Sequence, residues 1–191
     1  QLIVDLKAPG VTIRPIRMLD GSHHFNEVIF DNVQVPAERL VGNAGDGWKQ
    51  VSSELAYERS GPERFLSTMP LVERCLQLVL AGPAAVGDIA AGRLLARLMT
   101  LRNMSLAVWG ALGAGQSPAI EAAMVKDLGT NFERDAIEIV REAMTADPRV
   151  AGDDALEQLM ADALPLAPTY NLRGGTNEVL RNMIAKNLQG K

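Results

Sequence analysis

The spacing of hydrophobic residues changes close to residue 46. Before that point, apolar residues rich in β-branched side chains form short runs, separated by the turn-forming pairs Pro9-Gly10 and Asp20-Gly21. The runs cover 2–6, 11–16 and 25–35, and each predicts a β-strand. Because three strands bury too little apolar surface to be stable alone, we expect them to belong to a larger antiparallel sheet. Since the sequence opens with Gln1 rather than Met, we expect the other strands to precede it.

After residue 46, apolar residues recur at the three- and four-residue spacing of amphipathic helices. The first predicted helix runs from Trp48 to about residue 82, with either a kink or a local non-helical turn at Gly61-Pro62. The second covers 88–112 and ends at a glycine-rich turn. The residues expected to be buried in the first two helices include Trp48, Val51, Leu55, Cys75, Leu94, Leu98, Leu101, Ser105, Val108 and Leu112.

The third predicted helix ends near residue 146 and has the clearest start, with Ser117 as its cap and Pro118 at its first position. A shorter fourth helix begins at Asp154, with Glu157 at capping-box spacing, and ends near Pro165. The stripe predicted for the third helix consists of Ile120, Met124, Leu128, Phe132, Ala136, Ile139 and Ala143. The methionines at helical spacing are also expected in the core, namely Met69, Met99, Met104, Met124 and Met144.

A last helix follows the turn at Gly174-Gly175 and ends near residue 188. Its expected buried stripe is Val179, Leu180, Met183, Ile184 and Leu188. Long helices joined by short turns pack most easily as an antiparallel bundle. The sequence therefore predicts a mostly α protein, in which residues 46–191 form a four-helix up-down bundle and residues 1–45 form the last strands of an antiparallel β-domain.

Composition narrows the possible functions. The chain has 191 residues, of which 47% are hydrophobic and 22% charged, and these fractions are typical of a globular protein rather than a disordered one. A net charge of −4 makes a nucleic-acid-binding function improbable. With one cysteine and only His23 and His24 as imidazoles, we expect no internal disulfide and no metal site. No apolar run reaches the roughly 18 residues of a membrane helix.

Two groups of motifs resemble a known family. The first comprises Phe25-Asn-Glu-Val-Ile-Phe-Asp-Asn-Val-Gln-Val-Pro36 with Gly45-Asp-Gly-Trp48, and the second is Arg173-Gly-Gly-Thr-Asn-Glu-Val-Leu-Arg-Asn-Met-Ile-Ala185. Both are similar to the second half of acyl-CoA dehydrogenases. The resemblance implies FAD as cofactor, an acyl-CoA thioester as substrate and a trans-2,3 double bond in the product. It also implies electron transfer to an electron-transfer flavoprotein, assembly as a homo- or hetero-oligomer (dimer or tetramer) and a cytoplasmic location.

The resemblance also implies the identity of the catalytic base. Many members have a glutamate directly before the Gly-Thr of the C-terminal motif, where this sequence has Gly174. A subset places the glutamate on the first bundle helix instead, and Glu58 occupies the matching position here. We expect Glu58 to be the base, Arg59 to support Glu58 or to contact the substrate, and Gly174 to contact the substrate. The alternative is that Glu58 is an exposed helical carboxylate paired with a neighbouring arginine.

Gly175, Thr176 and Glu178 match family positions that contact FAD. The glycines allow close backbone approach, and Thr176 can cap a helix whose free N–H groups face an anion. The alternative is an ordinary helix cap without a ligand.

Two segments depart from the family pattern. Residues 80–88 lack the usual Arg-x-x-Phe-Gly, and residues 142–148 replace a glycine-rich turn; both motifs contact FAD in the family. Two alternatives therefore stay open: a non-catalytic scaffold subunit of a heteromeric dehydrogenase, and a flavin oxygenase or oxidase acting on a non-CoA substrate. We expect the 191 residues alone to be inactive.

Overall fold

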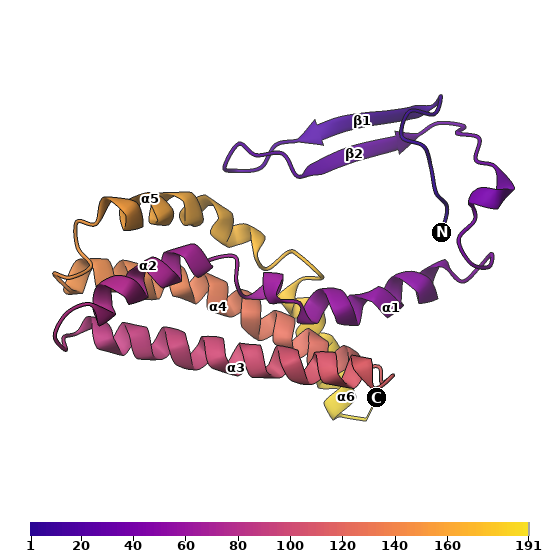
Figure 1. Cartoon of the computed structure of the whole chain (residues 1–191). Helices are drawn as coiled ribbons and strands as arrows, with labels where there is room; N and C mark the ends of the chain where they lie inside the picture. Colours follow the sequence, from indigo (N-terminus) through magenta and orange to yellow (C-terminus); the bar gives the residue numbers. More distant parts are fainter. Residues whose placement is uncertain (191) are drawn as a thin grey trace. The chain divides into compact units, whose positions relative to one another are not determined.

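The computed structural model describes residues 1–190 and is mostly helical (Figure 1). It divides into two compact units, Gln1–Glu54 and a second that begins at Leu55. The first contains an antiparallel hairpin of β1 (Val11–Ile16) and β2 (Phe25–Phe30), followed by the short 3₁₀ helix η1 (Ala37–Arg39). Val11 pairs with Phe30 and Ile16 with Phe25, so the hairpin and the antiparallel pairing agree with the sequence prediction.

The predicted strands differ from the observed ones at two places. Residues 2–6 form no strand, and Leu2 makes only an isolated bridge to Leu40. The strand predicted over 25–35 ends at Phe30, because the chain turns at Asn32, whose φ of 49° lies in the left-handed region. Within this unit both faces of the hairpin are exposed, including Phe25 and Phe30 at 57% each.

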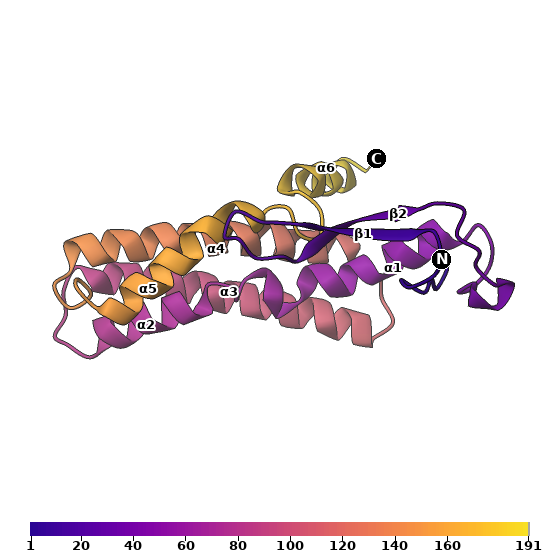
Figure 2. The same ribbon diagram turned by 90° about the horizontal axis from the view of Figure 1, so that it is seen from above.

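The second unit is a bundle of helices. It contains the end of α1 (Gly47–Ser60), η2 (Pro62–Arg64), α2 (Met69–Leu80), α3 (Gly87–Gly113), α4 (Ala119–Ala146), α5 (Asp154–Ala163), η3 (Leu164–Thr169) and α6 (Asn177–Leu188). The long helices α3 and α4 lie side by side, with α2 against both (Figures 1 and 2). Helix α5 packs on α2, and α6 packs on α4. None of the helices in residues 1–190 is long and apolar enough to cross a membrane.

Of the two alternatives predicted at Gly61-Pro62, the structure has the local break in the helix rather than a kink: helix α1 ends at Ser60, and the 3₁₀ helix η2 follows. The first predicted helix is therefore two helices. A second proline, Pro70, lies in the first turn of α2, the part of a helix that tolerates a residue without a backbone N–H. The chain therefore leaves the helical path between the two prolines, and this break positions Arg64 next to the end of α1.

The core agrees with the predicted stripe on α3 and only in part with the stripe on α4, where Phe132, Ala136, Ile139 and Ala143 are buried as predicted. Leu94, Leu101, Ser105 and Val108 are buried, and Cys75 on α2 is fully buried, which raises the pKa of its thiol to about 11. The predicted core residues that are exposed instead are Trp48, Val51, Met99, Met124, Leu128, Val179 and Leu188. On α4 the packed face includes small residues such as Gly129, because they let η2 approach closely: a Cβ there would lie 2.5 Å from the Arg64 carbonyl oxygen.

Two predicted caps are wrong. Helix α4 begins at Ala119 with Pro118 at the N-cap position, and Ser117 makes no side-chain cap. Helix α5 does begin at Asp154, but Asp153 is its cap: the Asp153 Oδ1 accepts from the Leu156 amide at 2.8 Å. Arg74 also donates to the Asp153 carboxylate, so Asp153 joins α2 to α5.

Candidate functional site

Glu58 lies in the last turn of α1 and is held by Arg64 at two atoms. The Arg64 Nη2 donates to the Glu58 Oε1 at 2.5 Å, and the Arg64 Nε donates to the Glu58 carbonyl oxygen at 3.0 Å. The Arg64 side chain is 8% exposed, whereas 42% of the Glu58 side chain is exposed. The carboxylate thus has a fixed position and an accessible side. Arg64 was missed at the sequence level, because residues six apart do not meet on a continuous helix and only the break after Ser60 brings them together.

Gly174 lies directly against this carboxylate. A Cβ at Gly174 would be 3.3 Å from the Glu58 Oε1, and the φ of Gly174 is +64°. The structure therefore brings together the two sequence positions at which the family resemblance places a catalytic glutamate. Only one of them has an acidic side chain in this chain.

Arg59 points to the turn rather than to Glu58. Its Nε donates to the Gly174 carbonyl oxygen at 3.0 Å, and its Nη1 lies 3.9 Å from the Met183 Sδ. The residue is 7% exposed, and desolvation lowers its pKa despite the nearby charge of Glu58. Arg59 thus joins α1 to the 171–177 turn, and the guanidinium that pairs with Glu58 belongs to Arg64.

The start of α6 brings Gly175, Thr176 and Glu178 together. Gly175 has a φ of +97°, and the Thr176 Oγ1 accepts from the Val179 amide at 3.5 Å, so the predicted cap is confirmed. The Glu178 side chain is exposed, and hydrogen bonds to its own amide and to the Thr176 side chain lower its pKa.

This charge distribution tests whether the helix start fits FAD. The positive end of α6 already has the carboxylate of Glu178 beside it, and a diphosphate would meet that negative charge. The Glu178 carboxylate thus lies where the prediction placed an external anion, and binding of FAD at this helix start stays a prediction. The Thr176 hydroxyl already accepts from Val179 and donates to Glu178, so what this turn offers an uncharged part of the cofactor is the glycine backbone and the second lone pair of the Thr176 oxygen.

Polar side chains of α4 hold the 171–177 turn from below the surface. The Lys126 Nζ donates to the Asn171 carbonyl oxygen and to the Asn177 Oδ1. Glu133, also fully buried, accepts from the Arg173 Nη2 at 2.7 Å. The sequence contains a signal for this pair: Lys126 and Glu133 are seven residues apart, so two charged residues lie on one face of a helix otherwise rich in buried apolar positions.

The two segments that depart from the family pattern meet at the other end of the bundle. The Asp147 Oδ2 accepts from the Gly87 amide at 2.8 Å, and Arg149 pairs with both Asp147 and Asp88. The Arg149 Nη1 also donates to the Pro83 carbonyl oxygen at 2.6 Å. These hydrogen bonds lower the pKa of Asp147 and raise that of Arg149. The charged groups of the two turns are thus paired with each other.

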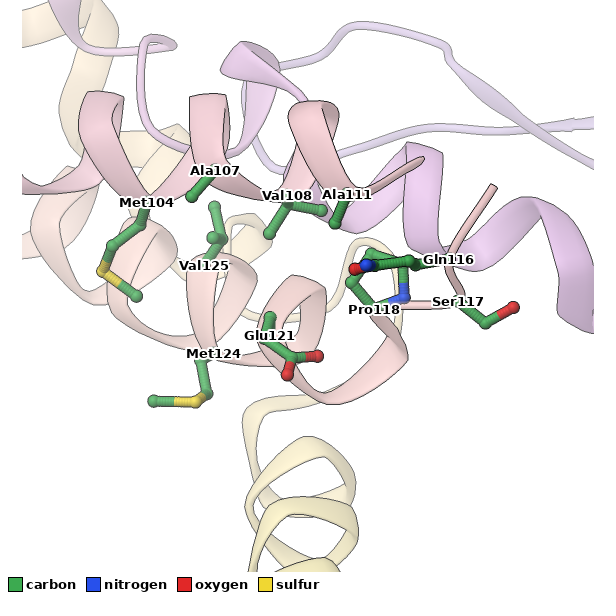
Figure 3. Close-up of a pocket in the computed structure, with 10 residues that line it drawn as sticks. All are labelled: Met104, Ala107, Val108, Ala111, Gln116, Ser117, Pro118, Glu121, Met124 and Val125. Carbon is green, nitrogen blue, oxygen red and sulfur yellow. The ribbon is translucent and has the colours of Figure 1, made fainter. Parts of the chain in front are cut away.

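A cavity of about 370 Å³ lies apart from these residues, between the end of α3 and the start of α4 (Figure 3). Its lining is mostly apolar and includes Met104, Val108, Met124 and Val125, with Glu121 as the one acidic group. None of the predicted site residues lines it. In the described part of the chain, no group of three or more His, Cys, Asp or Glu side chains has the arrangement of a metal site.

Comparison with solved structures identifies the fold. The chain aligns over 98% of its length with butyryl-CoA dehydrogenase from Megasphaera elsdenii, at a TM-score of 0.77 and 19% identity, covering 51% of that chain. It aligns over its whole length with a chain of the ChsE4–ChsE5 complex from Mycobacterium tuberculosis, at a TM-score of 0.74 and 24% identity, again covering 51%. The fold is therefore that of the second half of an acyl-CoA dehydrogenase.

Sequence comparison identifies the family. Residues 83–189 match the model described as "Acyl-CoA dehydrogenase, C-terminal domain", and the chain belongs to this family. It is 33% identical to the acyl-CoA dehydrogenase FadE29 of Mycobacterium tuberculosis over 96% of its length, and 31% identical to IpdE1 of the same organism over 99%. The chain spans about half the length of each of these relatives, 50% in both cases.

Proposed function

We propose that the protein containing this chain is a flavin-dependent acyl-CoA dehydrogenase in which Glu58 is the catalytic base. The observation that supports this most directly is the position of the Glu58 carboxylate beside Gly174. A side chain at position 174 would begin 3.3 Å from the Glu58 carboxylate, and we therefore infer that the acid on α1 replaces the one that many family members have in the C-terminal motif.

The reaction removes a proton from Cα of the thioester and a hydride from Cβ. Glu58 accepts the Cα proton, and FAD bound in the complete protein would accept the hydride from Cβ. Arg64 keeps the carboxylate in one orientation through the two hydrogen bonds to Glu58. The Glu58 side chain is 42% exposed, and an acyl chain can approach it from this exposed side. A bound acyl chain would exclude water there. Thr176 and the backbone of Gly175 are the groups we assign to the uncharged part of the cofactor.

The test is Glu58→Gln in the complete protein, with acyl-CoA turnover as the measurement. Loss of a positioned base lowers the rate by about 10²–10⁴-fold. Glu54→Gln is the matched control, because Glu54 is exposed one turn earlier on the same helix. A second variant, Glu58→Gln with Gly174→Glu, tests this replacement directly and should regain part of the lost activity. A fall of less than about tenfold in Glu58→Gln would exclude Glu58 as the base.

A second candidate function rests on the ion pairs at the other end of the bundle. The resemblance places cofactor-binding motifs at 80–88 and 142–148, and here Arg149 and Asp147 join those two segments to each other. This favours a scaffold subunit whose partner holds the flavin. The two candidates differ in colour: the dehydrogenase, purified alone, has flavin absorbance, whereas the scaffold subunit is colourless until a flavin-containing partner is added.

For substrate and partners we propose an acyl-CoA thioester, an electron-transfer flavoprotein as electron acceptor, and a second subunit of the same fold. The similarity to a chain of the ChsE4–ChsE5 complex supports the second subunit. So do the apolar side chains exposed on α3, which include Met99, Leu106 and Trp109.

A further inference from the structure

One lysine connects both ends of the turn that lies against Glu58. Lys126, on α4, has 0% of its surface exposed. Its Nζ donates to the Asn171 carbonyl oxygen at 3.1 Å and to the Asn177 Oδ1 at 2.6 Å. These acceptors are the first and last residues of the 171–177 turn, so a single ammonium group closes the turn.

The Asn177 side chain is oriented to accept this hydrogen bond. Its Oδ1 also accepts from the Thr130 Oγ1 at 3.1 Å, and its Nδ2 donates to the Asn131 Oδ1 at 3.4 Å. Both neighbours lie on α4, as Lys126 does. The amide is thus held with its oxygen toward the ammonium, and α4 determines the position of the first residue of α6.

The ammonium is buried among oxygen atoms that have no full charge. No carboxylate in residues 1–190 lies within ion-pairing distance of its Nζ, since Asp127 pairs with Arg181 and the Glu178 side chain is exposed. Arg64 from η2 and Arg173 from the turn add positive charge nearby. Burial and these two cations lower the pKa of Lys126 to about 8, and the carboxylates of Asp127 and Glu178 offset this only in part.

We propose that Lys126 is a positioning residue, whose ammonium holds the 171–177 turn so that Gly174 stays in place against Glu58 and Arg59. This rests on the proposed function for its catalytic consequence, whereas the structural consequence is independent of it. Hydrogen bonds from a charged donor are stronger than those from a neutral amine, so loss of the proton loosens the turn. The turn should therefore become more open as the pH rises through about 8.

The experiment measures amide hydrogen exchange of residues 171–177 in the complete protein, together with kcat and KM for acyl-CoA. Lys126→Met should speed exchange in this turn by about 10–100-fold, because a hydrogen bond to a charged group is lost. It should lower kcat more than it raises KM. Lys186→Met, an exposed lysine on α6, is the matched control and should change neither. Equal acceleration in the turn and in the α3 core would show a merely structural role and overturn the proposal.

The pH dependence gives a second, independent measurement that also decides the outcome if Lys126→Met does not fold. In the unmodified protein, exchange corrected for its intrinsic pH dependence should rise around pH 8. Asn177→Asp places a carboxylate beside the ammonium and should move this rise to higher pH. An unchanged midpoint in Asn177→Asp would refute the proposal. If the protein has no acyl-CoA activity but the midpoint moves, the proposed function fails while the positioning role stands.

Discussion

Replacing Arg173 with leucine should destabilise the helical unit far more than an ordinary surface substitution. Glu133 is fully buried, and its Oε2 accepts from the Arg173 Nη2 at 2.7 Å. Without Arg173, the carboxylate keeps the hydrogen bond from the Ser67 amide at 2.8 Å but loses its cation. The substitution therefore leaves a negative charge inside the protein with no opposite charge paired to it.

The magnitude follows from burial. Removing one partner of a buried ion pair costs about 3–5 kcal/mol. Arg173 is itself 29% exposed and Glu133 retains one donor, so the lower end applies, at about 3 kcal/mol. The guanidinium also lies 5.0 Å from the centre of the Tyr170 ring, and loss of that cation–π contact adds up to about 1 kcal/mol. The expected loss is thus about 3–4 kcal/mol.

Equilibrium urea unfolding of the complete protein, followed by far-UV circular dichroism, measures this loss. The matched control is Arg141→Leu, because Arg141 pairs with Glu138 on the surface of α4 and both side chains are 56% exposed. Its unfolding curve should be unchanged within error, since screened surface pairs contribute little. If Arg173→Leu loses less than about 1 kcal/mol, the average for any substitution, then Glu133 is not the buried charge described above.

Two further predictions concern glycine packing and pH. Gly129→Ala should lower the unfolding free energy by about 1–3 kcal/mol, because the new Cβ would overlap the Arg64 carbonyl. Gly110→Ala should raise it by about 0.5–1 kcal/mol, because a Cβ at Gly110 meets open space within a helix; equal effects of the two would contradict this packing. The folded state lowers the pKa of Asp147, so its contribution to stability is present above its ordinary value of 3.8 and is lost as the pH falls below it. The difference in Tm between the unmodified protein and Asp147→Asn should accordingly be constant near neutral pH and shrink only in acid, and shrinkage starting above pH 5 would refute the assignment.

The spacing of hydrophobic residues and the turn-forming residues were enough to predict the helices, but not which face of each helix is packed. The three longest predicted segments correspond to α1 with α2, α3 and α4, and the break fell close to Gly61-Pro62. The stripe on α4 was wrong at Met124 and Leu128, because this helix has apolar residues on two sides. Hydrophobicity alone does not distinguish a helix face that packs within the unit from one that is exposed. On α4 the packed face is the one that contains Gly129, because Gly129 permits the close approach of η2.

The candidate site shows the same division between local and long-range information. Glu58, Gly174 and Thr176 were chosen from short motifs, and the structure places Glu58 against Gly174 and makes Thr176 a cap. The partners of these residues come from distant segments: Lys126, Glu133 and Arg64 contact the turn or the carboxylate only after the helices pack. Their roles depend on tertiary contacts, which motif comparison does not contain.

The 171–177 turn is held by a buried ion pair, Glu133 with Arg173, rather than by apolar contacts alone. Replacing a buried ion pair with well-packed apolar residues is often neutral or stabilising, so Glu133 and Arg173 are poorly explained by stability alone. A hydrogen-bonded pair fixes position more narrowly than apolar contacts do, because it has preferred distances and angles. The double variant Glu133→Leu with Arg173→Leu separates the two roles. It should recover much of the stability lost in Arg173→Leu, while hydrogen exchange in the 171–177 turn should be faster than in the unmodified protein. A turn as protected as in the unmodified protein would show that apolar packing suffices to place Gly174 beside Glu58.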